Sequence, residues 1–205
     1  VNANGTVSTV SQSSISQALG NSVVFESANT VYTSITYDAN AQKVVIAYRD
    51  GGNSAYGTAI VGTVSGTSIS FGSPVVFESA NSTYISATYD ADNQKVVIAY
   101  SDAGNSGYGT AIVGTVSGTS ISFGSATVFE SALSEYISAT YDSTNQKVVV
   151  AYSDGGNGYY GTSIVGTVSG TSISFGSATV FESASSDYVS ATYDTNAQKV
   201  VIAYE

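Results

Sequence analysis

Apolar and polar positions recur along the chain with one long period. The tetrad Val-Phe-Glu-Ser returns every 52 residues, and a tyrosine and a lysine return at the same spacing. A fixed period of this length indicates a repeat architecture, in which each copy packs against its neighbours. The recurring positions are Phe25, Phe77, Phe129 and Phe181; Tyr37, Tyr89, Tyr141 and Tyr193; and Lys43, Lys95, Lys147 and Lys199.

Within one period the pattern predicts four strands and no helix. Tyr84–Asp90 alternates small and large side chains, and Lys95–Ser101 is nearly all apolar, as a strand covered on both faces should be. Tyr108–Val116 and Ser120–Glu130 follow, and glycine with Ser, Asn and Asp marks each boundary. Four antiparallel strands repeated at this length are typical of a β-propeller blade.

The two ends of the chain complement each other. Thr6–Ser16 aligns with Ile60–Ser70 as a third and fourth strand, and Tyr188–Glu205 supplies a first and a second. We therefore predict one all-β domain, a four-bladed β-propeller of four-stranded antiparallel blades closed by its terminal half-blades. Its parts are an outer half-blade 1–25, whole repeats 26–77, 78–129 and 130–181, and an inner half-blade 182–205.

Two other arrangements fit the same order of strands along the chain. Two chains can share one eight-bladed ring, or the chain can be a window of a longer repeat array. The first strand favours few blades, because Ser86, Ala87 and Thr88 are small where inner strands converge. We expect either a monomer or a dimer that shares its ring.

The order ISATYD…KVVIAYSD…TAIVGTVSGTSISFGSPVVFE resembles the blades of sialidase-like propellers. Phe71 and Pro74 fall near the aromatic residue and the proline of that pattern, but Ser65 and Gly66 occupy the turn where the Asp-box aspartate is expected. Arg49 is the only arginine, so the catalytic arginine cluster of sialidases cannot be carried over. The resemblance supports the fold and argues against that activity.

The core GTAIVGTVSGTSISFG is also similar to tandem repeats in structural and tail-fibre-like proteins of marine bacteriophages. This resemblance covers nearly the whole chain. It implies a component of a virion or a cell surface, and hence an extracellular or virion location, rather than a metabolic enzyme.

Composition removes several kinds of chemistry. The chain has no histidine and no cysteine, which excludes a Ser-His-Asp triad, a thiolate nucleophile and a zinc–sulfur site. We predict no enzyme activity, no catalytic residue and no cofactor. A net charge of −10 disfavours nucleic acid and anionic membranes, and no apolar run is long enough for membrane insertion.

The loops that follow each second strand carry the candidate site. They combine carboxylate, amide and aromatic groups, which suit the hydroxyls and the ring face of a sugar; hard oxygen ligands also suit calcium. The same D-x-G-N pattern is ordinary turn chemistry. The candidate ligand-binding residues are Asp50, Asn53, Tyr56, Asp102, Asn105, Tyr108, Asp154, Asn157 and Tyr160.

The glutamate of Val-Phe-Glu-Ser recurs in every copy, which argues against a catalytic acid/base pair because such a pair needs two unequal environments. We therefore expect a non-enzymatic structural or adhesion module that binds a surface glycan weakly or contacts other virion or surface proteins. The alternative is a purely architectural repeat protein with no ligand.

Overall fold

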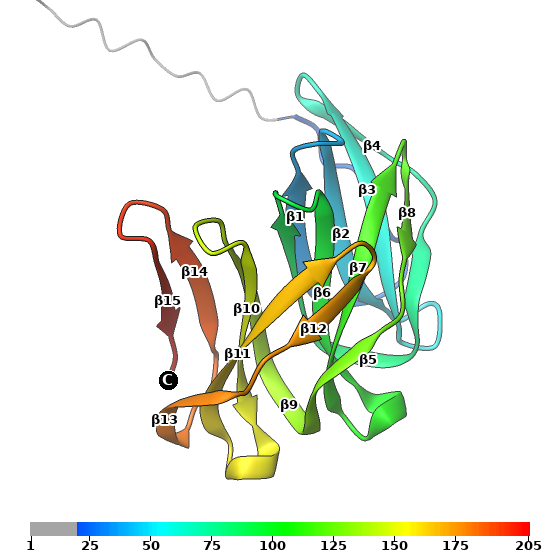
Figure 1. Cartoon of the computed structure of the whole chain (residues 1–205). Coiled ribbons are helices and arrows are strands. Elements are labelled where there is room, and N and C mark those ends of the chain that lie inside the picture. The colour runs from blue at the N-terminus through cyan, green and yellow to red at the C-terminus, as the bar shows by residue number, and fades with distance from the viewer. Residues whose placement is uncertain (1–19) are drawn as a thin grey trace, which may run out of the picture.

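The structure is a computed structural model that describes residues 20–205, and its described part is an antiparallel all-β fold (Figure 1). Two short 3-10 helices, η1 (Ala103–Asn105) and η2 (Gly155–Asn157), interrupt the strands in loops where no helix was predicted. The strands are β1 (Thr30–Asp38), β2 (Lys43–Asp50), β3 (Tyr56–Ser65), β4 (Ser68–Phe71), β5 (Val75–Asp90), β6 (Lys95–Asp102), β7 (Tyr108–Ser117), β8 (Ser120–Phe123), β9 (Thr127–Asp142), β10 (Lys147–Asp154), β11 (Tyr160–Ser169), β12 (Ser172–Phe175), β13 (Thr179–Ser185), β14 (Ser190–Asp194) and β15 (Lys199–Ala203).

The second and third predicted strands of the repeat are confirmed, but the first and fourth are not separate units. The predicted fourth strand Ser120–Glu130 is divided between β8 and the beginning of β9. The end of β9 is then the first strand of the next copy, so one 16-residue strand serves two copies. Its first part pairs with β7 and its second part with β10, and β5 joins β3 to β6 in the same way.

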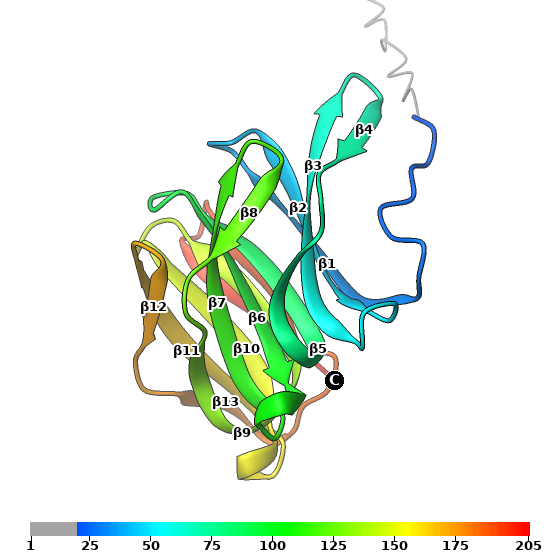
Figure 2. The ribbon, with the colours of Figure 1, turned by 90° about the vertical axis from the view of Figure 1, so that its right-hand side faces the viewer.

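A glycine follows each of the short strands β4, β8 and β12. Gly72 ends β4 and donates its N–H to the carbonyl of Val61 at 2.9 Å. A Cβ at Gly72 would lie 1.9 Å from the carbonyl oxygen of Thr119, in the turn between β7 and β8 of the next copy. The two backbones therefore come close at this point, and β4, β8 and β12 are short strands beside β3, β7 and β11 (Figure 2).

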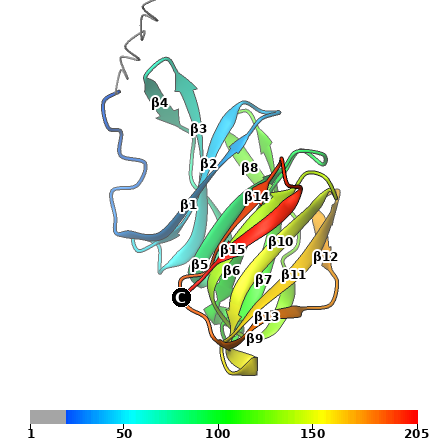
Figure 3. The ribbon, with the colours of Figure 1, turned by 90° about the vertical axis from the view of Figure 1, so that its left-hand side faces the viewer.

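The strand order is open rather than circular. Thirteen strands form one hydrogen-bonded series from β1 to β12 and β13, and β14 with β15 forms a separate two-stranded sheet (Figure 3). The predicted closure of four blades is therefore not shown. The segment predicted to close the ring falls mostly in residues 1–19, which lie outside the described part; residues 20–25 form no strand.

The core lies between successive copies. One cluster joins Val45 and Val61 of the first copy to Ile98, Tyr100 and Ile112 of the second, and another joins the second copy to the third in the same way. The middle strands β2, β6 and β10 are buried on both faces, as their apolar sequence predicted. Each copy thus depends on a neighbour to cover its apolar faces.

The first strands of successive copies are linked by a repeated hydrogen bond. Ser34 Oγ accepts the backbone N–H of Ala87 at 2.9 Å, Ser86 Oγ accepts that of Ala139, and Ser138 Oγ accepts that of Ala191, each at 2.9 Å. This series sets the register between copies and runs from β1 through β5 and β9 to β14. It holds the first strands of the four copies, far apart in sequence, next to one another.

Candidate functional site

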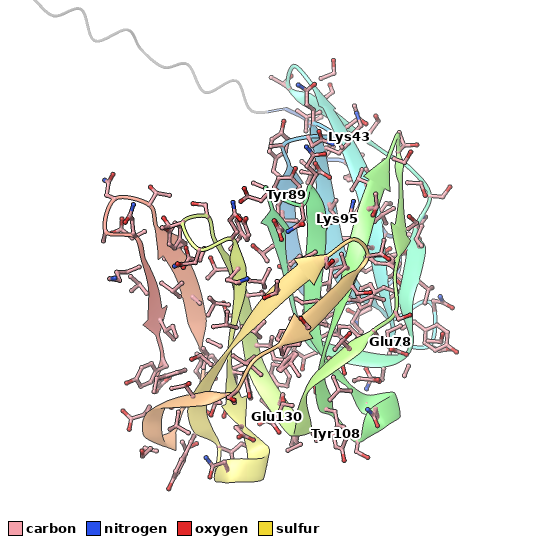
Figure 4. The ribbon with its side chains drawn as sticks, in the orientation of Figure 1. Lys43, Glu78, Tyr89, Lys95, Tyr108 and Glu130 are labelled. Atoms are coloured by element: carbon pink, nitrogen blue, oxygen red, sulfur yellow. The ribbon has the colours of Figure 1, made fainter. Side chains whose placement is uncertain are left out.

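The predicted loop residues lie at the end where β2, β6 and β10 finish and β3, β7 and β11 begin, here called the loop end. Figure 4 shows Tyr108 there, opposite the end that carries Lys43 and Lys95, here called the lysine end. Asn53, Asn105 and Asn157 are exposed, and the three tyrosines of the loops are half-buried. The Asp, Asn and Tyr of each loop lie within one short connection between two paired strands.

The three aspartates of these loops are engaged in their own turns. Asp50 Oδ1 accepts the N–H of Gly52 at 2.9 Å, Asp102 Oδ1 accepts that of Gly104 at 2.8 Å, and Asp154 Oδ1 accepts that of Gly156 at 2.9 Å. No hydrogen bond or ring pair within residues 20–205 joins one loop to another. The structure therefore presents three separate copies of the candidate site, and ligand binding by them stays a prediction.

The recurring glutamates have a packing role. Tyr100 donates its hydroxyl to Glu78 Oε2 at 3.1 Å, and Tyr152 donates to Glu130 Oε2 at 3.0 Å. Burial, reinforced by the charge of the glutamate, raises the pKa of both tyrosines. Glu78 and Glu130, held in this way, anchor buried tyrosines rather than forming a pair across the molecule. Tyr204 and Glu182 repeat the contact at the C-terminus.

A second cluster at the loop end was not predicted. Tyr32, Tyr84, Tyr136 and Tyr188 lie ring against ring, with centroid separations of 5.2, 5.2 and 5.1 Å; we call them the tyrosine row. Each adopts a left-handed backbone with φ between 49° and 52°; Tyr32, Tyr84 and Tyr136 lie at a register shift of the first strand, and Tyr188 lies just before β14. Such a φ is uncommon for a bulky residue and is typical of functional or strained positions.

The sequence contained one signal for this row, the recurrence of tyrosine at the 52-residue spacing. Spacing alone predicts no site for these tyrosines, because it does not tell which side of a strand a ring takes when a bulge intervenes. The bulge between Thr83 and Ser86, on either side of Tyr84, shifts the register of the strand there. The tertiary arrangement then aligns the four rings.

The residue before each tyrosine differs in all four copies: Val31, Thr83, Glu135 and Asp187. Tyr84 donates its hydroxyl to Glu135 Oε1 at 3.3 Å, which links the second copy to the third. Burial and then the charge of Asp187 raise the pKa of Tyr136. The row therefore has two carboxylates at one side and neutral side chains at the other.

The charges of the molecule are segregated between its two ends. The loop end holds ten carboxylates and one cation, Arg49, whereas the lysine end holds five aspartates and all four lysines. Nine of the ten net negative charges thus lie at the loop end. Its carboxylates are Glu26, Asp50, Glu78, Asp102, Glu130, Glu135, Asp154, Glu182, Asp187 and Glu205.

No group of three or more acidic side chains within residues 20–205 is arranged to hold a metal ion. The same residues contain no helix long and apolar enough to cross a membrane. Comparison with known proteins adds no relative: no protein-family model matches the chain, and no curated protein sequence matches it.

Proposed function

We propose that this protein is a non-enzymatic structural or adhesion module of a virion or cell surface that binds glycan weakly at its loop end. The observation that carries the proposal is the threefold presentation of one loop, with its carboxylate, amide and ring, at the same end of three successive copies. Weak sites gain strength when several engage one polymer, because the second contact is intramolecular. A repeated surface polysaccharide is such a polymer.

The test is a glycan array that includes marine bacterial polysaccharides. We expect the native chain to bind at least one polysaccharide, and the double variant Asp102→Ala/Tyr108→Ala to bind it more weakly because one of three sites is lost. Asp92→Asn, at the lysine end, is the matched control and should bind as the native chain does. An array on which the native chain binds nothing contradicts glycan binding.

We further propose that the four copies close into a four-bladed ring. Three kinds of contact link each copy to the next: the serine hydrogen bond, the ring contact of the tyrosine row, and the contact of a tyrosine hydroxyl with the turn of the preceding copy at Asn40, Asp92 or Thr144. Each kind occurs three times, and a closed ring of four copies requires a fourth contact of each kind, between the last copy and the first. The residues for every missing contact are present. Ser190, Tyr188 and Asn196 lie on one side; Ile35, Tyr32 and Tyr37 lie on the other, and these last three are exposed.

A purely architectural role is the second candidate, and one observation favours it. Asp50, Asp102 and Asp154 each accept a backbone N–H through Oδ1 in their own turns, so the carboxylate of each loop stabilises the turn. In that role the repeats serve packing alone. The chain then binds no glycan and associates with other virion or surface proteins.

A further inference from the structure

The tyrosine row contains the only contacts between two tyrosine rings within residues 20–205. The contacts join Tyr32 to Tyr84, Tyr84 to Tyr136, and Tyr136 to Tyr188, with centroid separations of 5.2, 5.2 and 5.1 Å. Every other ring pair of this part of the chain contains a phenylalanine. Two phenols in contact can undergo a reaction that a phenol and a phenyl ring cannot, because each phenol can lose one electron and one proton to become a radical, and two such radicals couple.

Packing does not explain the hydroxyls of the row. Tyr84 donates its hydroxyl to Glu135 Oε1 at 3.3 Å, whereas the hydroxyls of Tyr32, Tyr136 and Tyr188 have no protein partner within the described part of the chain. Phenylalanine serves in the other ring pairs of the repeat, yet all four positions of the row carry tyrosine. The phenol therefore recurs where a phenyl ring would pack equally well.

The rings are held in place and are still open to solvent. Each tyrosine of the row has the same left-handed backbone, and a serine two residues further along joins its strand to the next copy. Tyr136 is packed between two rings, and its hydroxyl is not buried. A small oxidant therefore reaches the row without separating the rings, and the same holds where a closed ring of copies packs Tyr188 against Tyr32.

We propose that the tyrosine row is a site of oxidative cross-linking, in which hydrogen peroxide and a haem peroxidase join neighbouring tyrosines by carbon–carbon bonds. Two phenols each lose one electron and one proton, and the peroxide takes up both electrons and both protons to become two molecules of water. The proton of Tyr84 leaves through Glu135, its hydrogen-bond partner. The radicals join through the carbons ortho to their hydroxyls, and the ortho hydrogens move to the oxygens, which restores both phenols.

A cross-link in the row would replace a kind of bond that this chain cannot form. The sequence has no cysteine, so no disulfide can join its copies. Neighbouring tyrosines of the row are 52 residues apart, and a bond that closes so long a loop restricts the unfolded chain. The cross-linked protein should therefore unfold at a temperature about 5–10 °C higher than the native chain. This inference goes beyond glycan binding and does not depend on it.

The experiment treats the full chain at micromolar concentration with hydrogen peroxide and a haem peroxidase. Dityrosine fluorescence follows the reaction, and mass spectrometry of the intact chain and of its peptides identifies the linked residues, because each cross-link removes two hydrogen atoms. Rings held in contact react as if they were far more concentrated than rings on separate molecules. We expect cross-links within one molecule to exceed those between molecules by at least about tenfold.

Phenylalanine variants locate the reaction and keep a ring at every position. Tyr32→Phe combined with Tyr136→Phe leaves no contact between two tyrosines in the row, whether or not the ring of copies is closed, and should lower the yield within one molecule about tenfold. The matched control is Tyr37→Phe combined with Tyr141→Phe, which removes a tyrosine from the lysine end of the same two copies. It should change the yield less than about twofold, because neither ring contacts another tyrosine. Thermal unfolding before oxidation shows that both variants are folded.

Three results would overturn the inference: no dityrosine in the native chain, dityrosine that links mainly separate molecules, or a yield that Tyr32→Phe/Tyr136→Phe lowers no more than the control does. A cross-link between Tyr32 and Tyr188 requires the closed ring of copies, whereas the other three do not. Cross-links at those three contacts without one between Tyr32 and Tyr188 therefore support oxidative cross-linking and contradict ring closure.

Discussion

At the scale of single residues, identical tyrosines have different partners according to their copy. Tyr100 and Tyr152 are buried and donate to Glu78 and Glu130. Tyr48 is equally buried, but its hydroxyl has no partner within the described part of the chain. The equivalent glutamate, Glu26, accepts the N–H of Ala28 instead, at 2.8 Å.

This difference predicts opposite results from the same substitution. Tyr100→Phe should lower the free energy of unfolding by about 1–2 kcal/mol, because a buried hydrogen bond to a carboxylate is lost. Tyr48→Phe should leave it unchanged or raise it, because an unpaired buried hydroxyl is removed. Urea unfolding measures both free energies. An equal decrease in the two variants would show that Tyr48 donates its hydroxyl to Glu26.

At the scale of elements, the repeated segment Gly57–Ser73 is the scaffold of the copy. It supplies β3, the turn at Gly66 and the short strand β4. Gly66 has φ +60° and open space around it, whereas Gly72 abuts the backbone of the next copy. The first glycine shapes the hairpin, and the second allows two copies to approach.

These two glycines should therefore respond differently to alanine. Gly66→Ala should cost about 1–2 kcal/mol of stability, the usual strain of a left-handed backbone. Gly72→Ala should cost more than about 3 kcal/mol, because the new Cβ meets a carbonyl oxygen that cannot move independently of its turn. Thermal unfolding of the two variants checks this order. A smaller loss for Gly72→Ala would mean that the copies separate easily.

At the scale of the whole molecule, the terminal copies expose what the middle copies bury. Val201 in β15 is 51 % exposed and Tyr204 is 43 % exposed, whereas the equivalent residues Val45 and Tyr48 of the first copy are fully buried. The described part of the chain places no strand on the second edge of β15. A free edge of this kind readily pairs with another strand.

Ring closure predicts the register of that pairing. Val45 lies opposite Val61 in the first copy, and the repeats place Val201 and Val7 at the equivalent positions. In a chain without other cysteines, Val7→Cys with Val201→Cys should form a disulfide within one molecule, since opposite Cβ atoms of antiparallel strands lie close.

The control for this cross-link is Val7→Cys with Ile202→Cys. A shift of one residue turns the second side chain to the other face, so this pair should remain reduced. Non-reducing electrophoresis distinguishes the results. A disulfide-linked dimer indicates a ring shared by two chains, and the absence of any cross-link contradicts closure by the N-terminal segment.

The repeat pattern was sufficient to predict the second and third strands of each copy, because the alternation of apolar residues and the turn residues are local properties. Lys95–Ser101 and Tyr108–Val116 match β6 and β7 to within one residue at their ends. The candidate loops were also found where predicted, since an Asp followed by Gly and Asn specifies a turn wherever it occurs. Because the copies are nearly identical, the same turn was predicted in all three loops.

The tertiary structure decided everything that depends on contact between copies. It joined the fourth strand of one copy to the first strand of the next, so that β5 pairs with β3 in one part and with β6 in the other. It also aligned Tyr84 with Tyr136 and placed Glu135 at the hydroxyl of Tyr84, 51 residues earlier in the chain. Spacing along the sequence shows the length of the repeat, but it does not show which residues of different copies are in contact. The second and third strands of each copy were therefore determined by the sequence alone, and the joined strands and the tyrosine row only by the way the copies stack.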